Sequence, residues 1–241
     1  LYRRGDGLQP DDREVAHWYR VAADLGDVQA QFMFGCLYAR GEGVALDLKH
    51  AARYFELAAS GGHPQAAFNL GVFSLNGQGT EQNVAEAKRW FAIAATGGLA
   101  QAQLRLGQIL IREAVTQVEI ASARILIERA SDAGSEEAKV ALARMLLADG
   151  STDSEQKALV VLREAANAGE VEACELLLQK EAPGRNLEAV IQVLQRAARS
   201  GKPSAKFILA EAMLTGERVP RDVLTAIALL KEAAAGQEAR A

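Results

Sequence analysis

Several residue types are scarce in this sequence of 241 residues, and each scarcity excludes a class of protein. Two cysteines are too few for a disulfide scaffold. The apolar runs are only a handful of residues long, whereas a membrane-spanning helix needs about 20 apolar residues. We therefore expect no direct membrane insertion in this segment. Aromatic residues make up only 5% of a chain that is 49% apolar, and the abundant alanine that makes up the difference favours closely packed helices.

Basic residues are also too few for a nucleic-acid binder. The 27 lysines and arginines are outnumbered by 31 aspartates and glutamates, which gives a net charge of -4. Domains that bind nucleic acid carry a basic patch, and anionic membrane surfaces attract clusters of lysine and arginine. Neither is present, so we expect no nucleic-acid partner.

What the chain does contain is an internal repeat. The pattern Ala-Ala-x-x-Gly, or a close variant of it, recurs at intervals of 32 to 36 residues. Periods of this length indicate helical hairpins, each too small to bury its own apolar face and therefore stacked on its neighbours. We predict an all-α fold, an α/α solenoid of stacked antiparallel helix hairpins that forms a single domain over residues 1–241. The predicted units end near Gly26, Gly62, Gly98, Gly134, Gly169, Gly201 and Gly236.

One unit shows how the first helix and its turn are encoded. Residues 28–40 place apolar side chains at spacings of three and four, which is typical of a helix with one buried face. Gly41 and Gly43 follow, and glycine adopts positive φ without strain. The sequence therefore predicts a helix over 28–40 and a chain reversal directly after it.

The second helix is predicted over residues 48–60. Asp47 precedes it as an N-cap, and Gly62 ends it in the left-handed conformation. Pro64 and Pro203 are predicted to open first helices. Alanine stands four residues after each capping glycine, which indicates close approach of two helices. The positions equivalent to Asp47 are Asp11, Asn83, Glu119, Ser154, Asn186 and Asp222, and the alanines are Ala30, Ala66, Ala102, Ala138, Ala173 and Ala205.

These motifs resemble Sel1-like repeats, a subclass of the tetratricopeptide superfamily. Gly-x-Gly-Val-x-x-Asp stands at 41–47, and Tyr-Phe-x-x-Ala-Ala-x-x-Gly follows at 54–62. The resemblance implies a non-enzymatic scaffold without cofactors that binds another protein or a peptide. From residue 99 on, the Gly-x-Gly loop and the aromatic pair are replaced, and the unit ending at Gly201 is shortened around 182–184. We therefore expect a regular first half and a degenerate but still helical second half.

Catalytic chemistry has little support in the sequence. His17, His50 and His63 occupy three different settings and are expected to be solvated rather than to bind metal. Cys36 and Cys174 lie four periods apart and are expected to be unpaired, small buried hydrophobes. The aromatic pairs 18–19, 54–55 and 90–91 are expected to pack between hairpins, with a ligand cage as the alternative. The Gly-x-Gly loops lack the preceding strand and the following Lys-Ser of a phosphate-binding loop. We predict no catalytic, cofactor or metal site.

The predicted recognition surface is the concave face, lined in this superfamily by the first helix of each unit. Glutamines stand there in register, beside apolar side chains and a few polar or cationic ones, and Glu137 and Glu172 continue the glutamine row. Such a groove suits a peptide or helix of a partner; the alternative is a solvated face with some positions in the core. The candidate residues are Gln29, Phe32, Arg40, Gln65, Phe68, Asn76, Gln101, Leu104 and Arg112.

Several functions remain open at this point. An adaptor in bacterial envelope assembly, secretion or signalling is favoured, and the absence of an Asn-x-Ser/Thr acceptor agrees with a bacterial source. Alternatives are an enzyme related to the cysteine-rich Sel1-like proteins associated with penicillin binding and β-lactam hydrolysis, an RNA-binding helical repeat, and a passive spacer. The compartment stays open between the periplasm or cell envelope and the cytoplasm.

Both ends of the chain fall inside a repeat. We therefore expect a fragment cut mid-repeat at both ends. Terminal repeats that lack a neighbour leave an apolar face open. Fraying of residues 1–10 and 236–241, or self-association through these repeats, is predicted.

Overall fold

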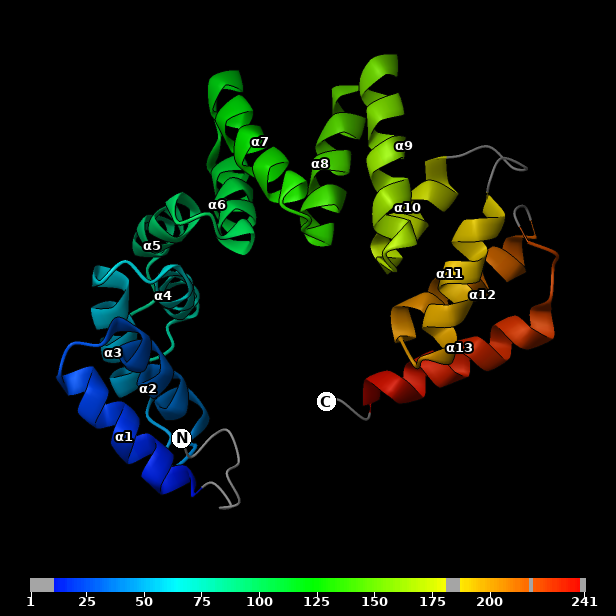
Figure 1. Ribbon diagram of the computed structural model, residues 1–241. Helices are drawn as coiled ribbons and strands as arrows, with labels where there is room; N and C mark the ends of the chain where they lie inside the picture. Colours follow the sequence, from blue (N-terminus) through cyan, green and yellow to red (C-terminus); the bar gives the residue numbers. More distant parts are fainter. Residues whose placement is uncertain (1–10, 181–186, 217–218, 239–241) are drawn as a thin grey trace. The chain divides into compact units, whose positions relative to one another are not determined.

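The computed structural model describes residues 11–180, 187–216 and 219–238, and within these ranges all regular secondary structure is helical (Figure 1). The predicted all-α class is confirmed. The helices are α1 (Asp12–Asp24), α2 (Val28–Arg40), α3 (Leu48–Ser60), α4 (Pro64–Asn76), α5 (Val84–Thr96), α6 (Ala100–Glu113), α7 (Gln117–Asp132), α8 (Glu136–Asp149), α9 (Thr152–Asn167), α10 (Val171–Lys180), α11 (Leu187–Arg199), α12 (Pro203–Thr215) and α13 (Val223–Glu238).

The chain divides into two compact units. Unit 1 comprises Leu1–Ala130 and unit 2 comprises Ser131–Ala241. In unit 1 each helix from α1 to α5 packs against the next, and in unit 2 the same holds from α8 to α12. This pattern is that of stacked hairpins, in which contacts are made between neighbours along the chain. The expectation of one continuous domain over 1–241 stays a prediction.

The helix boundaries of the regular repeats agree with the sequence pattern. The predicted helices over 28–40 and 48–60 coincide with α2 and α3. Pro64 and Pro203 stand at the first turns of α4 and α12. Six of the seven unit-ending glycines have φ between 81° and 97°. The seventh, Gly236, lies inside α13, which continues to Glu238. No helix end coincides with it, and the unit end predicted there stays a prediction.

Two features require glycine at the second position of each Gly-x-Gly loop: a positive φ and a close contact that leaves no room for a Cβ. Gly43 and Gly79 have φ of 69° and 67°. A Cβ added to Gly43 would lie 2.0 Å from the carbonyl oxygen of Asp12, and one added to Gly79 would lie 2.2 Å from that of Leu48. Asp12 and Leu48 are the first residues of α1 and α3. Each loop therefore rests directly on the backbone of the preceding hairpin.

The predicted N-caps hold where the loop is regular. The side chains of Asp11, Asp47, Asn83 and Asp222 each accept a hydrogen bond from a backbone N–H in the first turn of their helix. The backbone N–H groups of His50 and Lys49, together with the His50 imidazole, hold the pKa of Asp47 below its usual range.

One predicted N-cap, Ser154, is wrong, and Glu119 in the equivalent slot has a different role. Glu119 lies within α7, where its carboxylate accepts from the N–H groups of Val115 and Thr116, while its own N–H donates to Thr116 Oγ1. This arrangement is a capping box, and it lowers the pKa of Glu119. Ser154 lies within α9, whose N-cap is Ser151. These two repeats lack the Gly-x-Gly loop, which fixes the number of residues between the helices, so the second helix starts at a different position from that in the regular repeats. The predicted cap at Asn186 and the tight turn at 182–184 lie outside the described residues.

Small residues mark the closest helix contacts, as predicted. The six alanines that follow the capping glycines are all buried. Glycines in α4 and α6 face large side chains of the next helix: a Cβ on Gly71 would lie 2.6 Å from the Phe91 ring, and one on Gly107 would lie 2.7 Å from Ile127. The second members of two aromatic pairs, Phe55 and Phe91, are buried between hairpins as expected.

Candidate functional site

Three first helices of unit 1 each carry a line of accessible residues along one side. Helices α2 and α4 are flanked on both sides by second helices, which bury most of their surface. Residues spaced four, three and four apart stay accessible, and this spacing places them on one side of a helix. We call these residues the first-helix stripe: Gln29, Met33, Cys36 and Arg40 on α2; Gln65, Asn69, Val72 and Asn76 on α4; Gln101, Arg105, Gln108 and Arg112 on α6.

The glutamines at the start of the stripe are held by local hydrogen bonds. Gln65 Nε2 donates to Asn69 Oδ1 at 3.4 Å, one turn further along α4. His63 Nδ1 accepts from the N–H of Ala66, so its Nε2 carries the hydrogen and donates to Gln29 Oε1 at 3.1 Å. Gln29 in one hairpin is thereby joined to the cap of the next first helix.

The apolar row beside the stripe changes character along unit 1. Phe32 and Phe68 are half-buried, and their rings pack against those of Phe55 and Phe91. Leu104 is only 1% exposed. Its predicted place in the groove is therefore wrong: the shorter aliphatic side chain sinks into the core. Within this row, the accessible apolar surface is supplied by Phe32 and Phe68.

The far end of the stripe is polar or cationic. Arg40, Asn76 and Arg112 are exposed, and Arg40 Nη1 lies 3.7 Å from the carboxylate of Glu42 in the adjoining loop. Arg105 adds a further exposed cation, bonded to Gln108. The twelve residues of the stripe include three arginines and no carboxylate. This face of unit 1 therefore favours an anionic or neutral ligand.

Three of the equivalent positions in unit 2 carry carboxylates. Glu137, Glu172 and Glu211 are exposed at the corresponding places on α8, α10 and α12. Arg144 on α8 is engaged by Glu172 in an ion pair. The predicted continuation of the glutamine row by Glu137 and Glu172 holds in register, but it brings acidic rather than amide side chains.

Part of this site was missed by the sequence reasoning. The predicted set lacks Met33, Cys36, Asn69, Val72, Arg105 and Gln108, although their spacing from Gln29, Gln65 and Gln101 carries the signal. Side chains four, three and four residues apart lie along one line of a helix. The 36-residue period shows which residues of successive hairpins are equivalent. It does not show which residues of one helix lie on the same side.

Catalytic groups do not converge in the part of the chain that the structure describes. No cluster of three or more His, Cys, Asp or Glu side chains with metal-binding geometry is present among residues 11–180, 187–216 and 219–238. Both cysteines are free thiols, and burial raises the pKa of each. His17 and His50 are exposed as expected, whereas His63 is half-buried against Phe32. Trp18 is 56% exposed rather than packed between hairpins.

The described helices are also too short or too polar to cross a bilayer. Thr152–Asn167, for example, has 16 residues and contains five charged ones. The finding concerns the described ranges only.

A family comparison matches most of the chain. The Sel1 repeat profile matches residues 1–27, 28–63, 64–99, 100–135 and 203–237. The segment between 135 and 203 has no match. It includes the shortened unit that ends at Gly201. No curated protein sequence was found to match the chain.

Solved structures agree with the fold. A protective antigen of uropathogenic Escherichia coli that displays an SLR fold is 25% identical, with a TM-score of 0.83 over 98% of this chain and 53% of the antigen. The chain thus spans about half the length of that protein. A Sel1 repeat protein from Oxalobacter formigenes is 21% identical, with a TM-score of 0.76 over 92% of this chain and 96% of its own. An immunity protein from Pseudomonas aeruginosa is 20% identical, covering 97% and 84%, with a TM-score of 0.52.

Proposed function

Because the chain belongs to the Sel1 repeat family, a family of protein-interaction scaffolds, we propose that it is a non-enzymatic adaptor that binds a segment of a partner protein along the first-helix stripe of unit 1. The observation that carries the proposal is the composition of that stripe. It joins three arginines and four glutamines to the half-buried rings of Phe32 and Phe68, without any carboxylate. Interfaces are enriched in arginine and aromatic residues in the same way.

The arrangement indicates the kind of segment that fits. Phe32 and Phe68 occupy the same position in successive hairpins and offer two apolar contacts. Arg105 and Arg112 lie on α6, at one end of the series, and attract carboxylates. The proposed ligand is therefore a peptide or helix with apolar residues followed by acidic ones. The cellular role proposed with it is envelope assembly, secretion or signalling in a bacterium.

The test is selection from a displayed library of random peptides, followed by measurement of the selected peptides on variants. We expect acidic residues to be enriched, and the double variant R105E/R112E to bind the selected peptides roughly tenfold or more weakly, because charge complementarity becomes repulsion. R89E is the matched control: Arg89 is also an exposed arginine, but it lies on the second helix α5. Its affinity for the same peptides is expected to equal that of the wild type.

Other outcomes identify the alternatives. If the peptides bind R105E/R112E and R89E equally well, the first-helix stripe is not the binding site. If no peptide is enriched from the library, a passive spacer is favoured. A low-salt gel shift that weakens steeply with added salt would indicate RNA binding. Nitrocefin turnover above that of a heat-inactivated sample would indicate an enzyme.

A further inference from the structure

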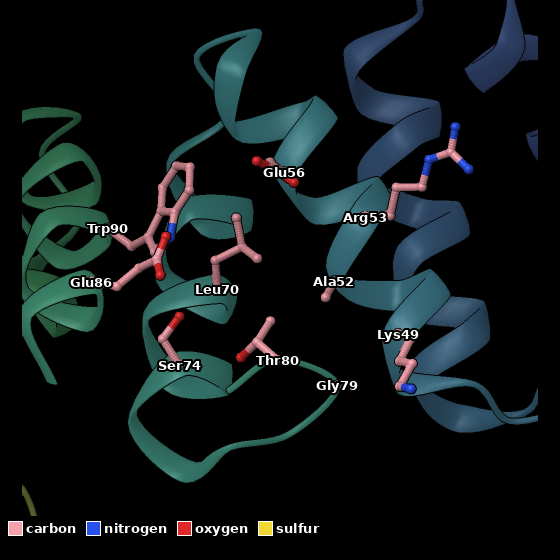
Figure 2. Close-up of a pocket in the computed structure, with 10 residues that line it drawn as sticks. All are labelled: Lys49, Ala52, Arg53, Glu56, Leu70, Ser74, Gly79, Thr80, Glu86 and Trp90. Atoms are coloured by element: carbon pink, nitrogen blue, oxygen red, sulfur yellow. The ribbon is translucent and has the colours of Figure 1, made fainter. Parts of the chain in front are cut away.

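A pocket of about 240 Å³ lies within unit 1 on a different surface from the first-helix stripe. It is formed by α3, α4, α5 and the loop between α4 and α5. Figure 2 shows Trp90 and Glu86 of α5 on one side, side chains of α3 on the other, and Ser74 and Thr80 between them. With 3.6 residues per turn, Ser74 projects from the opposite side of α4 to the stripe residues Asn69 and Val72. Binding at the pocket is therefore independent of the proposed function.

The preceding hairpin contains the same feature one repeat earlier. A notch of about 210 Å³ is lined there by Arg13, Ala16, His17, Arg20, Phe34, Tyr38, Gly43 and Val44. Adding 36 to each number gives eight of the ten residues that line the pocket: Lys49, Ala52, Arg53, Glu56, Leu70, Ser74, Gly79 and Thr80. The two sites are therefore equivalent positions of successive repeats. They differ in the side chains that close them on the side of the second helix.

The difference is a missing aromatic ring. In the earlier hairpin, the ring of Tyr38 packs on Phe34 at 4.8 Å, on His50 at 5.1 Å and on Tyr54 at 6.0 Å between centroids. This ring closes the notch towards α3. In the next hairpin the same position holds Ser74, which has no ring. The pocket consequently extends to Glu86 and Trp90, the equivalents of His50 and Tyr54.

The pocket also contains a polar group without a partner. Thr80 Oγ1 is buried and makes no hydrogen bond to the described residues. A buried hydroxyl without a partner is less stable than a bonded one, because its lost hydrogen bonds to water are not replaced. Ser74, beside it, is 2% exposed. A ligand that brings its own hydroxyl or carbonyl to this point would satisfy the Thr80 hydroxyl.

Charge at the rim favours a neutral occupant. Lys49 and Arg53 stand on the rim with Glu56 and Glu86, and all four are exposed. The two signs are balanced, so neither a cation nor an anion gains a clear advantage. The interior surfaces are Ala52, Leu70 and the indole of Trp90, which suit a ring because offset stacking on an aromatic face adds to apolar burial.

We propose that this pocket binds the side chain of a tyrosine from a partner polypeptide. The phenol ring would take the place that Tyr38 fills in the preceding hairpin, between Leu70 and Trp90. Its hydroxyl would lie in the polar end of the pocket near Ser74 and Thr80. The pocket is then a second, side-chain-specific anchor on unit 1, on the opposite side of α4 from the first-helix stripe.

The test uses the two tryptophans as internal reporters. The chain has Trp90 in the pocket and Trp18, which is exposed on α1. The capped tripeptides Gly-Tyr-Gly and Gly-Leu-Gly are titrated into the ¹⁵N-labelled full chain, and the two indole N–H resonances are followed. We expect Gly-Tyr-Gly to shift the Trp90 signal with a dissociation constant on the order of 1 mM, as for other small ligands. Gly-Leu-Gly should bind at least about fivefold more weakly, and Trp18 should not respond.

Variants at position 74 distinguish the pocket from nonspecific contact. S74Y restores the ring of the preceding hairpin and is expected to abolish the Trp90 shift, whereas S74A leaves the pocket open and should still bind. If S74Y does not fold by circular dichroism, S74L fills the same space with a smaller side chain. No Trp90 shift in the wild type, an equal shift in the filled variant, or equal affinity for Gly-Leu-Gly would each overturn the proposal.

Discussion

The imidazole of His63 stacks on the ring of Phe32, with centroids 4.3 Å apart and planes inclined by 19°. His63 is the N-cap of α4 and also the hydrogen-bond partner of Gln29. One side chain thus connects the cap of a helix to the candidate binding face of the previous hairpin. Burial against Phe32 lowers the pKa of His63, because the charged imidazolium loses solvation.

This geometry predicts a pH dependence of stability. The pKa of His63 is lower in the folded chain than the value of about 6.5 in an unfolded one. The contribution of neutral His63 is therefore complete above about pH 6.5 and is lost as pH falls from there towards the folded pKa. Protonation also removes the Nδ1 acceptor that caps α4. Between about pH 7.5 and pH 5, we expect Tm to fall further for the wild type than for H63N. Asparagine caps a helix without titrating.

Thermal unfolding followed by circular dichroism at a series of pH values measures this difference. The same decrease in both proteins would assign the acid sensitivity to other groups, such as the capping carboxylate of Asp47.

Replacing Gly79 by alanine should be more costly than replacing Gly98. Both glycines have positive φ, of 67° and 81°, so alanine at either position costs about 1–2 kcal/mol for the left-handed conformation. The two positions differ in the space around an added Cβ. At Gly79 it would clash with the backbone, 2.2 Å from the carbonyl oxygen of Leu48, whereas at Gly98 it would have no neighbour within 4 Å. We expect G79A to lose a further 1–3 kcal/mol or so. Urea unfolding of the two variants compares them, and equal losses would show that the hairpins separate without cost.

Gly71 and Phe91 should be energetically coupled. A Cβ on Gly71 would lie 2.6 Å from the Phe91 ring, so G71A is expected to destabilise by about 1–3 kcal/mol through overpacking. The less regular repeat places Ile127 opposite Gly107, which suggests F91L as the compensating change. In a double-mutant cycle, G71A should cost less in the F91L background than in the wild type. Additive losses would argue that the two helices shift apart to accommodate the methyl group.

Cys174 should be unreactive until the chain unfolds. It is fully buried on α10, and burial raises its pKa to about 11. The thiolate is the reactive form, so a neutral, enclosed thiol reacts slowly. Iodoacetamide at about pH 8 is expected to label half-buried Cys36 first, and Cys174 only at the rate of unfolding. Fast labelling of Cys174 in the C36S variant under native conditions would indicate frequent opening of unit 2.

Most helix boundaries of unit 1 could be predicted from the sequence, because in the regular repeats both ends of a helix carry a local signal. Helices 28–40 and 48–60 are each delimited by a capping side chain and a glycine that adopts positive φ. Where the loop glycines are missing, the boundary depends on weaker signals. Helix α7 begins at Gln117 after a capping box formed by Thr116 and Glu119. Helix α9 begins at Thr152 with Ser151 as its N-cap, so repeat register alone misplaced the N-cap at Ser154.

The candidate site was predicted less completely, because register shows which residues are equivalent but not how deeply each is buried. Phe32, Phe68 and Leu104 occupy one repeat position, yet Leu104 lies in the core while both rings stay half-exposed. The pocket beside Ser74 depends on three helices at once. Its only sign in the sequence is serine in place of Tyr38 one repeat earlier, and the significance of that change emerges only when Trp90 is placed beside it.

The seating of Gly43 on Asp12, and of Gly79 on Leu48, has a consequence for how such chains grow. The atom beneath each loop is a main-chain oxygen, which every amino acid supplies. A hairpin with both loop glycines can therefore follow almost any predecessor, whatever residue begins that predecessor's second helix. Gene duplication can therefore add a hairpin at this contact without requiring a new set of complementary side chains.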